Sequence, residues 1–324
     1  MGGADGAWPY AGLISDSAGN LYGTTAYGGA TSDSCSQPEG IPEGCGVVFK
    51  LNTTGKETVL HTFTGADGAN PQVGLIMDSA GNLYGTAPNG GTGAPGVCNL
   101  EYSGCGVVYR VDTAGAETVL YSFTGGADGG GPAAALIRDS EGNLYGTAMS
   151  GGAFGSGVVF ELDSAGTETI LYSFAGGTDG GTPIGGVIRD YAGNLYGTAY
   201  SGGIGTCPFS GCGVVFKLDT TGDETVLYSF TGGSDGGMPR ANLIRQSTGN
   251  LVGTTSLGGV DGVFGTGGVV FKLTATGTET VLHSFEWGTG LYPSAVIQGS
   301  AGNLYGSAIE GGACGHGVVF KLEP

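Results

Sequence analysis

Short apolar segments bounded by glycine, aspartate or asparagine recur along the whole chain, and this pattern predicts β-strands joined by tight turns. Three phrases return in a fixed order: GNLYGT, GVVFKL and ETVLYSF, each with close variants. The last two are apolar on both faces of the pleat, which is typical of strands in sheets that pack between other sheets. No stretch keeps the 3.6-residue apolar period of an amphipathic helix, so we expect an all-β chain with almost no helix.

Self-similarity divides the chain into six repeats. The asparagine of the first phrase recurs as Asn20, Asn82, Asn143, Asn194, Asn250 and Asn303. Each repeat predicts four strands: a segment such as Leu136–Asp139, then NLYGT, VVFKL and TVLYSF. We expect a single six-bladed β-propeller of four-stranded antiparallel blades over residues 1–324, with blades at about 9–63, 71–123, 132–174, 183–230, 239–285 and 293–324. The alternative is a solenoid of stacked sheets, which requires capping repeats.

The sixth repeat lacks the phrase ETVLYSF, which predicts the fourth strand in each of the other five repeats. We expect the last blade to lack its outer strand, either because the chain was excised from a longer protein or because the blade has an open edge. An uncovered edge strand is a template for pairing with another chain. Self-association through Val318–Leu322 is therefore one prediction, and it would make the protein a self-assembling structural subunit.

The phrases DSAGNLYGT, GVVFKLD and GxETVLYSFTGGxDG resemble the tandem repeat called GloVer, which occurs in bacterial surface proteins that end in a variety of cell-surface anchors. All three phrases recur in order over essentially the whole chain. The D-x-x-G-N-L-Y core is also similar to the blades of NHL-type propellers. The resemblance implies an exported, surface-associated propeller, and it brings no catalytic residues with it.

The charge balance excludes two classes of partner. The 324 residues include 10 Lys+Arg and 28 Asp+Glu, for a formal net charge of −18. A chain this acidic has no electrostatic attraction to nucleic-acid phosphates or to an anionic bilayer surface. No apolar run approaches the roughly 18 residues that span a bilayer as a helix, so we expect no membrane span.

Six of the seven cysteines form three close pairs, each in the loop between the second and third strands of one blade. Their spacings differ from loop to loop and no histidine accompanies them, which favours disulfides over metal sites. The expected disulfides are Cys35–Cys45, Cys98–Cys105 and Cys207–Cys212. Disulfides indicate an oxidising compartment, so we expect a secreted, extracellular or cell-surface protein. Cys314 remains as a free thiol, which we expect to be partly buried.

In propellers of the kind that the sequence resembles, the loops after the second and fourth strands emerge on one face, where ligands usually bind. In this chain those loops hold all the cysteines and the length variation, whereas the other turns are nearly the same in every repeat. Aromatic rings in such loops can stack on the apolar faces of sugars. The candidates are Trp8, Tyr27, Tyr102, Tyr200, Trp287 and Tyr292. Ring closure would place Trp8 beside Trp287.

One aspartate followed by glycine stands before the first strand of each of the first five blades. These residues are Asp5, Asp67, Asp128, Asp179 and Asp235. As a ring of carboxylates they could bind sugar hydroxyls or Ca²⁺, and as turn residues they would cap their own loops. Calcium needs six to eight oxygen ligands, which one aspartate per loop does not supply. We therefore expect no cofactor and keep calcium as an alternative.

Catalytic candidates are few. Glu310, Asp261 and His316 lie in the variable loops, and two carboxylates there would suit a glycosidase or lyase. His61 and His283 replace a tyrosine of the fourth strand, which predicts a packed aromatic ring. The sequence contains no G-x-S-x-G, H-E-x-x-H or phosphate-loop motif. It favours a binding or adhesion module that recognises a glycan, with a polysaccharide-acting enzyme as the alternative.

Overall fold

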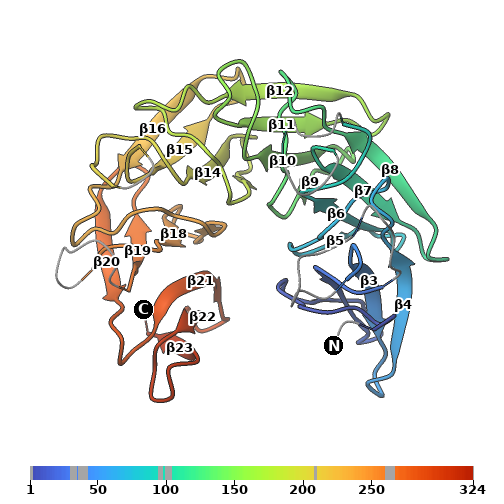
Figure 1. Cartoon of the computed structure of the whole chain (residues 1–324). Coiled ribbons are helices and arrows are strands. Elements are labelled where there is room, and N and C mark those ends of the chain that lie inside the picture. The colour runs from blue at the N-terminus through green and yellow to red at the C-terminus, as the bar shows by residue number, and fades with distance from the viewer. Residues whose placement is uncertain are drawn as a thin grey trace. The chain divides into compact units, whose positions relative to one another are not determined.

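A computed structural model describes residues 3–29, 35, 43–93, 98, 104–207, 210–259 and 267–323. These residues form β-strands and turns, with no α-helix among them. The strands assemble into six antiparallel sheets, five of four strands and a last one of three (Figure 1). The fold is that of a six-bladed β-propeller, as the repeats predict, and each repeat forms one blade.

In every blade the strands pair in chain order, so the edge strands are the first and fourth in five blades and the first and third in the last. The first strands are β1 (Ile14–Ser15), β5 (Ile76–Met77), β9 (Ile137–Arg138), β13 (Ile188–Arg189), β17 (Ile244–Arg245) and β21 (Leu291–Gln298). The second strands are β2 (Leu21–Thr25), β6 (Leu83–Ala87), β10 (Leu144–Ala148), β14 (Leu195–Ala199), β18 (Leu251–Thr254) and β22 (Leu304–Glu310).

The third strands are β3 (Val47–Leu51), β7 (Val107–Val111), β11 (Val158–Leu162), β15 (Val214–Leu218), β19 (Val269–Leu273) and β23 (Val318–Leu322). The fourth strands are β4 (Glu57–Thr62), β8 (Glu117–Ser122), β12 (Glu168–Ser173), β16 (Glu224–Ser229) and β20 (Glu279–Ser284). In the first five blades the sequence predicts the second, third and fourth strands within one or two residues and overestimates the first, since the expected Leu136–Asp139 pairs only over Ile137–Arg138. In the last blade both β21 and β22 are longer than predicted.

By its internal contacts the chain divides into two compact units, Met1–Leu171 and Tyr172–Pro324, and the boundary falls within β12. The first unit holds the first two blades and most of the third. The second unit holds the last three blades and the end of β12. The expectation of a single domain over 1–324 stays a prediction.

The turn between the first and second strands is closed by one aspartate. Asp16 Oδ1 accepts backbone hydrogen bonds from Ala18 and Asn20, at 3.0 and 2.9 Å. Its Oδ2 accepts from Asn20 Nδ2 and the Tyr22 hydroxyl, at 2.7 and 3.0 Å. These donors, led by the Asn20 side chain, lower the pKa of Asp16 to about 2. Asp78, Asp139 and Asp190 bind their own turns in the same way, which explains the D-x-x-G-N-L-Y phrase.

Each blade core is built on a glycine that faces an aromatic ring. Gly146 of β10 lies opposite Phe160 of β11, and a Cβ at Gly146 would come within 2.6 Å of that ring. The ring of Phe160 in turn meets Phe123 of the preceding blade, edge to face at 5.2 Å. Equivalent contacts join four more pairs of consecutive blades: Phe63–Tyr109, Phe174–Phe216, Phe230–Phe271 and Phe285–Phe320. The aromatic residues of VVFKL and TVLYSF therefore hold consecutive blades together.

The third strand of the last blade differs in burial from the same strand of the preceding blade. The strands β19 and β23 have the same sequence, VVFKL. Val270 of β19 is fully buried in a cluster that includes Val296 and Leu304 of the next blade. The equivalent Val319 of β23 is 86% exposed. The sheet β21–β23 has three strands, as expected, and self-association through Val318–Leu322 stays a prediction.

Candidate binding site

The loops that precede the first strand and the loops that follow the second strand lie on the same side of each blade. One residue from each loop forms an isolated bridge in every four-stranded blade. These bridges are Ala7–Tyr27, Ala69–Asn89, Gly130–Ser150, Gly181–Ser201 and Gly237–Leu257. In the last blade, Leu291 of β21 pairs with Glu310 of β22 at the same place. We call this side of each blade the loop side.

The residue after the bridge has an unusual backbone. It precedes a proline in all six blades and has a positive φ: Trp8 (58°), Asn70 (59°), Gly131 (66°), Thr182 (51°), Met238 (55°) and Tyr292 (56°). A left-handed conformation is uncommon for any residue except glycine and costs about 1–3 kcal/mol. Glycine nevertheless occupies this position only once. The backbone is therefore the same in each blade while the side chain differs.

The disulfide loops help to hold this left-handed residue. The carbonyl oxygen of Cys45 accepts a hydrogen bond from the backbone N–H of Asn70, at 2.8 Å. Cys105 and Cys212 make the same bond to Gly131 and Met238, at 2.8 and 2.7 Å. The structure contains the three expected disulfides, Cys35–Cys45, Cys98–Cys105 and Cys207–Cys212. Each disulfide thus fixes a loop-side residue of the next blade as well as its own loop.

Trp8 lies at the centre of an aromatic cluster in the first blade. Its ring meets Tyr27 edge to face, with ring centroids 5.0 Å apart and planes at 90°. Tyr10 lies on another side at 6.1 Å. Trp8 is 41% exposed and Tyr10 is 62% exposed, although both are large aromatic residues. The first blade therefore presents partly exposed rings at fixed angles to one another.

The other aromatic candidates lie in the second unit, except for Tyr102, which is outside the described residues. The ring of Tyr200 stacks under the guanidinium of Arg240, 4.9 Å from its centroid, and the Tyr200 hydroxyl accepts a hydrogen bond from that group. Trp287 is 63% exposed, and Tyr292 is the left-handed residue of the last blade. Because Trp8 and Trp287 belong to different units, their expected proximity stays a prediction.

The loop aspartates cap their own loops. Asp128 accepts hydrogen bonds from the backbone N–H and hydroxyl of Thr124, and from the Tyr121 hydroxyl at 3.2 Å. Asp179 and Asp235 bind their loops and Tyr172 or Tyr228 in the same way. Asp67 binds Thr64, but its second oxygen meets His61 instead of a tyrosine. Asp5 is exposed. A ligand-binding role for these five carboxylates stays a prediction.

A second carboxyl group faces each of these aspartates: Glu57 faces Asp5, and glutamates at the same repeat position face the other four. The sequence does not reveal this pairing. Glu117, Glu168, Glu224 and Glu279 each begin the fourth strand of the blade that follows the aspartate. One carboxyl oxygen of each is buried and has no hydrogen-bond partner among the described residues. Burial, reinforced by the charge of Asp128, raises the pKa of Glu168 to about 7. Burial followed by Asp179 or Asp235 does the same at Glu224 and Glu279.

The Glu117 position differs because His61 stands beside it. Burial raises the pKa of Glu117 to about 7, opposed by His61 and reinforced by Asp67. Burial also acts to raise the pKa of Asp67, but hydrogen bonds from His61 and Thr64 outweigh it and leave that pKa below its usual value. The glutamate that begins each ETVLYSF phrase was the one sequence feature that could have pointed to these carboxyl pairs. Its aspartate partner could not be identified, because the pairing depends on how the blades pack.

A catalytic role for Glu310, Asp261 and His316 stays a prediction. Glu310 ends β22 and is exposed, and His316 is exposed beside Gly311. Asp261 lies outside the described residues. Cys314 is unpaired, as expected, but it is exposed and not partly buried. Cys314 lies at the tip of the turn that the bridge between Gly311 and His316 closes, which leaves the thiol in solvent.

The fold and the loop side define a class of protein: a disulfide-stapled β-propeller whose blades keep one backbone and vary their loop residues. The chain belongs to the family of the Gloeobacter/Verrucomicrobia repeat, whose model matches residues 37–265. This confirms the resemblance drawn from the repeated phrases. No curated protein matches the sequence.

Solved structures with the same fold are distant in sequence. A gluconolactonase from Xanthomonas campestris is 15% identical, with a TM-score of 0.51, over 99% of this chain and 88% of that one. A putative 6-phosphogluconolactonase from Bacteroides uniformis is 16% identical, with a TM-score of 0.55, over 93% and 78%. A protein of unknown function from Bacteroides thetaiotaomicron is 13% identical, with a TM-score of 0.51, over 97% and 69%. At this identity the likeness shows the fold alone.

Among the described residues, none belongs to a helix long and apolar enough to cross a bilayer.

Proposed function

We propose that this protein is an extracytoplasmic binding or adhesion module that recognises a glycan through the loop side of its blades. The observation that carries the proposal is the cluster of Trp8, Tyr10 and Tyr27. In an edge-to-face pair the edge of one ring covers one face of the other, so it is the exposed parts of Trp8 and Tyr10 that remain to stack on the apolar face of a pyranose. The family and the three disulfides support a location outside the cytoplasm.

The variation of the left-handed position supports recognition over a purely structural role. A position whose backbone is strained for every residue except glycine would carry glycine in each blade if only the fold mattered. Instead it carries an indole, a hydroxyl and a phenol at Trp8, Thr182 and Tyr292, which are partly exposed, whereas Asn70 and Met238 at the same position are buried. Tyr200 and Arg240 add a flat cationic surface in the second unit, which suits a sugar that bears a carboxylate.

A glycan and polysaccharide panel tests the proposal, using the whole chain with its disulfides intact. We expect wild-type protein to bind at least one saccharide, and Trp8→Ala to weaken that binding by about tenfold or more, as loss of a central aromatic contact does. Tyr191→Ala is the matched control, because Tyr191 is fully exposed in the turn after β13, away from the loop side.

Three outcomes would count against the proposal. Binding to no saccharide would remove it, and equal losses in the two variants would show that the loop side is not the site. Cleavage of a saccharide or lactone by wild-type protein would replace a binding module with an enzyme. In that case the similarity to the gluconolactonase structures would extend from the fold to the activity.

A further inference from the structure

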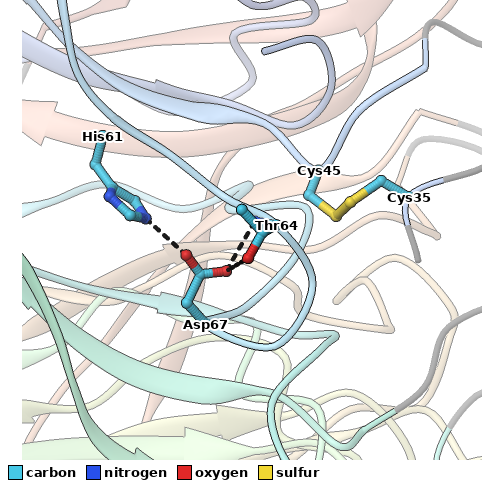
Figure 2. A network of polar contacts seen from close by, with 5 residues as sticks. All are labelled: Cys35, Cys45, His61, Thr64 and Asp67. Atoms are coloured by element: carbon cyan, nitrogen blue, oxygen red, sulfur yellow. Dashed lines mark hydrogen bonds and ion pairs between the residues drawn. A yellow bond between two sulfur atoms is a disulfide. The ribbon is translucent and has the colours of Figure 1, made fainter. Parts of the chain in front are cut away.

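One of the sites where a loop aspartate faces a glutamate of the next blade contains a histidine. His61 of β4, Asp67 of the following loop and Glu117 of β8 each offer one ligand atom, and these atoms all lie within 4.8 Å of one another. His61 Nε2 is 3.0 Å from Asp67 Oδ2 (Figure 2). All three residues are partly buried, and all belong to the first unit.

The local chain holds His61 and Asp67 in place. Asp67 Oδ1 accepts two hydrogen bonds from Thr64, from its backbone N–H at 2.8 Å and its hydroxyl at 2.9 Å, which leaves Oδ2 directed at the histidine (Figure 2). The ring of His61 packs edge to face on Phe63, with centroids 4.8 Å apart. Phe63 belongs to the same buried cluster as the disulfide Cys35–Cys45. Two of the three groups are therefore fixed before any ligand arrives.

The third group, the Glu117 carboxyl, lacks a hydrogen-bond partner for one of its oxygens. Glu117 Oε1 is buried and has no hydrogen-bond partner among the described residues. A buried carboxyl oxygen without a partner is unfavourable. A second carboxylate beside it makes the site more unfavourable unless a positive charge lies between them. His61 supplies a nitrogen ligand at that place.

From this geometry we propose that His61, Asp67 and Glu117 bind a divalent transition-metal ion of the Zn²⁺ type that links the first two blades. Zinc accepts imidazole nitrogen and carboxylate oxygen at about 2.0–2.2 Å, so ligand atoms on one ion are separated by roughly 3–4 Å. The His61–Asp67 distance already lies in that range, and the Glu117 oxygen, which lies within 4.8 Å of both atoms, would move closer on binding. Three protein ligands leave the remaining coordination positions for water.

The other blades provide an internal control for the proposal. Tyr121 occupies the position of His61 in the second blade and donates its hydroxyl to Asp128, which faces Glu168. Tyr228 repeats this arrangement with Asp235 and Glu279. A protonated phenol is a hydrogen-bond donor and a poor metal ligand at neutral pH. The chain therefore contains both the tyrosine form, which satisfies the aspartate, and the histidine form, which can bind metal.

The test is metal titration of the full-length protein and His61→Tyr after treatment with a chelator. For wild type we expect one Zn²⁺ per chain by calorimetry and elemental analysis, a visible spectrum on Co²⁺ substitution, and a higher Tm with Zn²⁺. His61→Tyr copies a residue that the same position carries in other blades, so we expect it to fold. We expect it to lose at least about 100-fold in Zn²⁺ affinity, because even partners of a metal ligand contribute that much.

Tyr121→His adds the converse measurement and should raise the stoichiometry to two ions per chain. The proposal is overturned if folded wild type, with unchanged circular dichroism, binds no Zn²⁺ stoichiometrically. It is also overturned if His61→Tyr binds Zn²⁺ as tightly as wild type, because the ion then sits elsewhere. Retention of affinity in Glu117→Gln would reduce the site to the pair His61 and Asp67 and contradict a link between blades.

Discussion

The turns repeat both backbone and side chain from blade to blade, whereas the loop side repeats the backbone and varies the side chain. In the turns between the first and second strands, Asp16, Asp78, Asp139 and Asp190 make the same hydrogen bonds. At the left-handed position of the loop side, the backbone also repeats, but the side chain changes from Trp8 to Asn70 and Thr182. Side chains that repeat support the fold. Among those that vary, Asn70 and Met238 are buried, so only the exposed ones, such as Trp8, are available for recognition.

The same contrast explains the site beside Glu117. Its aspartate and glutamate repeat in later blades, where a tyrosine completes the arrangement. At the sites that contain both carboxylates and a preceding fourth strand, this position holds His61 once and a tyrosine otherwise (Tyr121, Tyr172 and Tyr228), whereas His283 precedes a loop without that aspartate. One change within a repeated frame therefore alters the chemistry of the site without altering its backbone. This is how a tandem repeat can gain a local function while it keeps the fold.

The largest expected effect comes from comparing a repeated glycine of the blade core with a glycine of the loop side. A Cβ at Gly146 would lie 2.6 Å from Phe160 and 2.9 Å from Leu136, so Gly146→Ala must displace a packed ring. We expect a loss of about 2–3 kcal/mol in the free energy of unfolding, measured by urea denaturation. Gly288→Ala is the loop control, because nothing lies within 4 Å of its Cβ position, and it should change stability by less than about 0.5 kcal/mol. Equal losses of stability in Gly146→Ala and Gly288→Ala would contradict the difference between the blade core and the loop side.

Removal of a loop disulfide is expected to have a smaller effect on stability. Removing the disulfide between Cys207 and Cys212, five residues apart, by a double substitution to serine should lower stability by about 2 kcal/mol. The loss arises because the unfolded loop regains conformational freedom. Because Cys212 also holds Met238 in its left-handed conformation, limited proteolysis should then detect faster cleavage near Met238. Proteolysis that remains slow would separate the staple from that residue.

The smallest expected effect concerns pH. The pKa of Glu168 in the folded protein, about 7, exceeds its ordinary value of 4.5, so the folded state holds the extra proton between these values. Its contribution to stability is present below about pH 4.5 and is lost as the pH rises through 7. Glu168→Gln should therefore reduce the stability difference between pH 5 and pH 8 by about 1 kcal/mol, a figure lowered for solvent screening because Glu168 is only half-buried.

Chemical denaturation at the two pH values provides this measurement, with Glu141→Gln as the control because Glu141 is exposed in a turn. The groups that face Glu168 are Asp128 and Tyr121, and neither is changed in these variants. A difference between pH 5 and pH 8 that is the same in wild type and Glu168→Gln would contradict the assigned burial of this carboxyl group.

The sequence predicts the repeated features well because they are local. Strands such as β10 and β11, the aspartate turns and the three disulfides follow from phrases that lie within one blade. The carboxyl pairs could not be predicted, because Asp128 and Glu168 meet only when consecutive blades pack. The fourth strands also carry a bulge: Val108 pairs with Tyr121 and Tyr109 with Val119, so one residue is left over. Such an extra residue changes the direction of the side chains that follow it.

The central claim, recognition by the loop side, is tested most directly by the fluorescence of one indole. In Trp287→Phe the only tryptophan left is Trp8. Titration of this variant with a saccharide identified on the panel should shift the emission of Trp8, and the shift should saturate at the Kd measured for wild type. Wild-type affinity in this variant with no change in Trp8 emission would place the ligand away from the cluster and contradict the account.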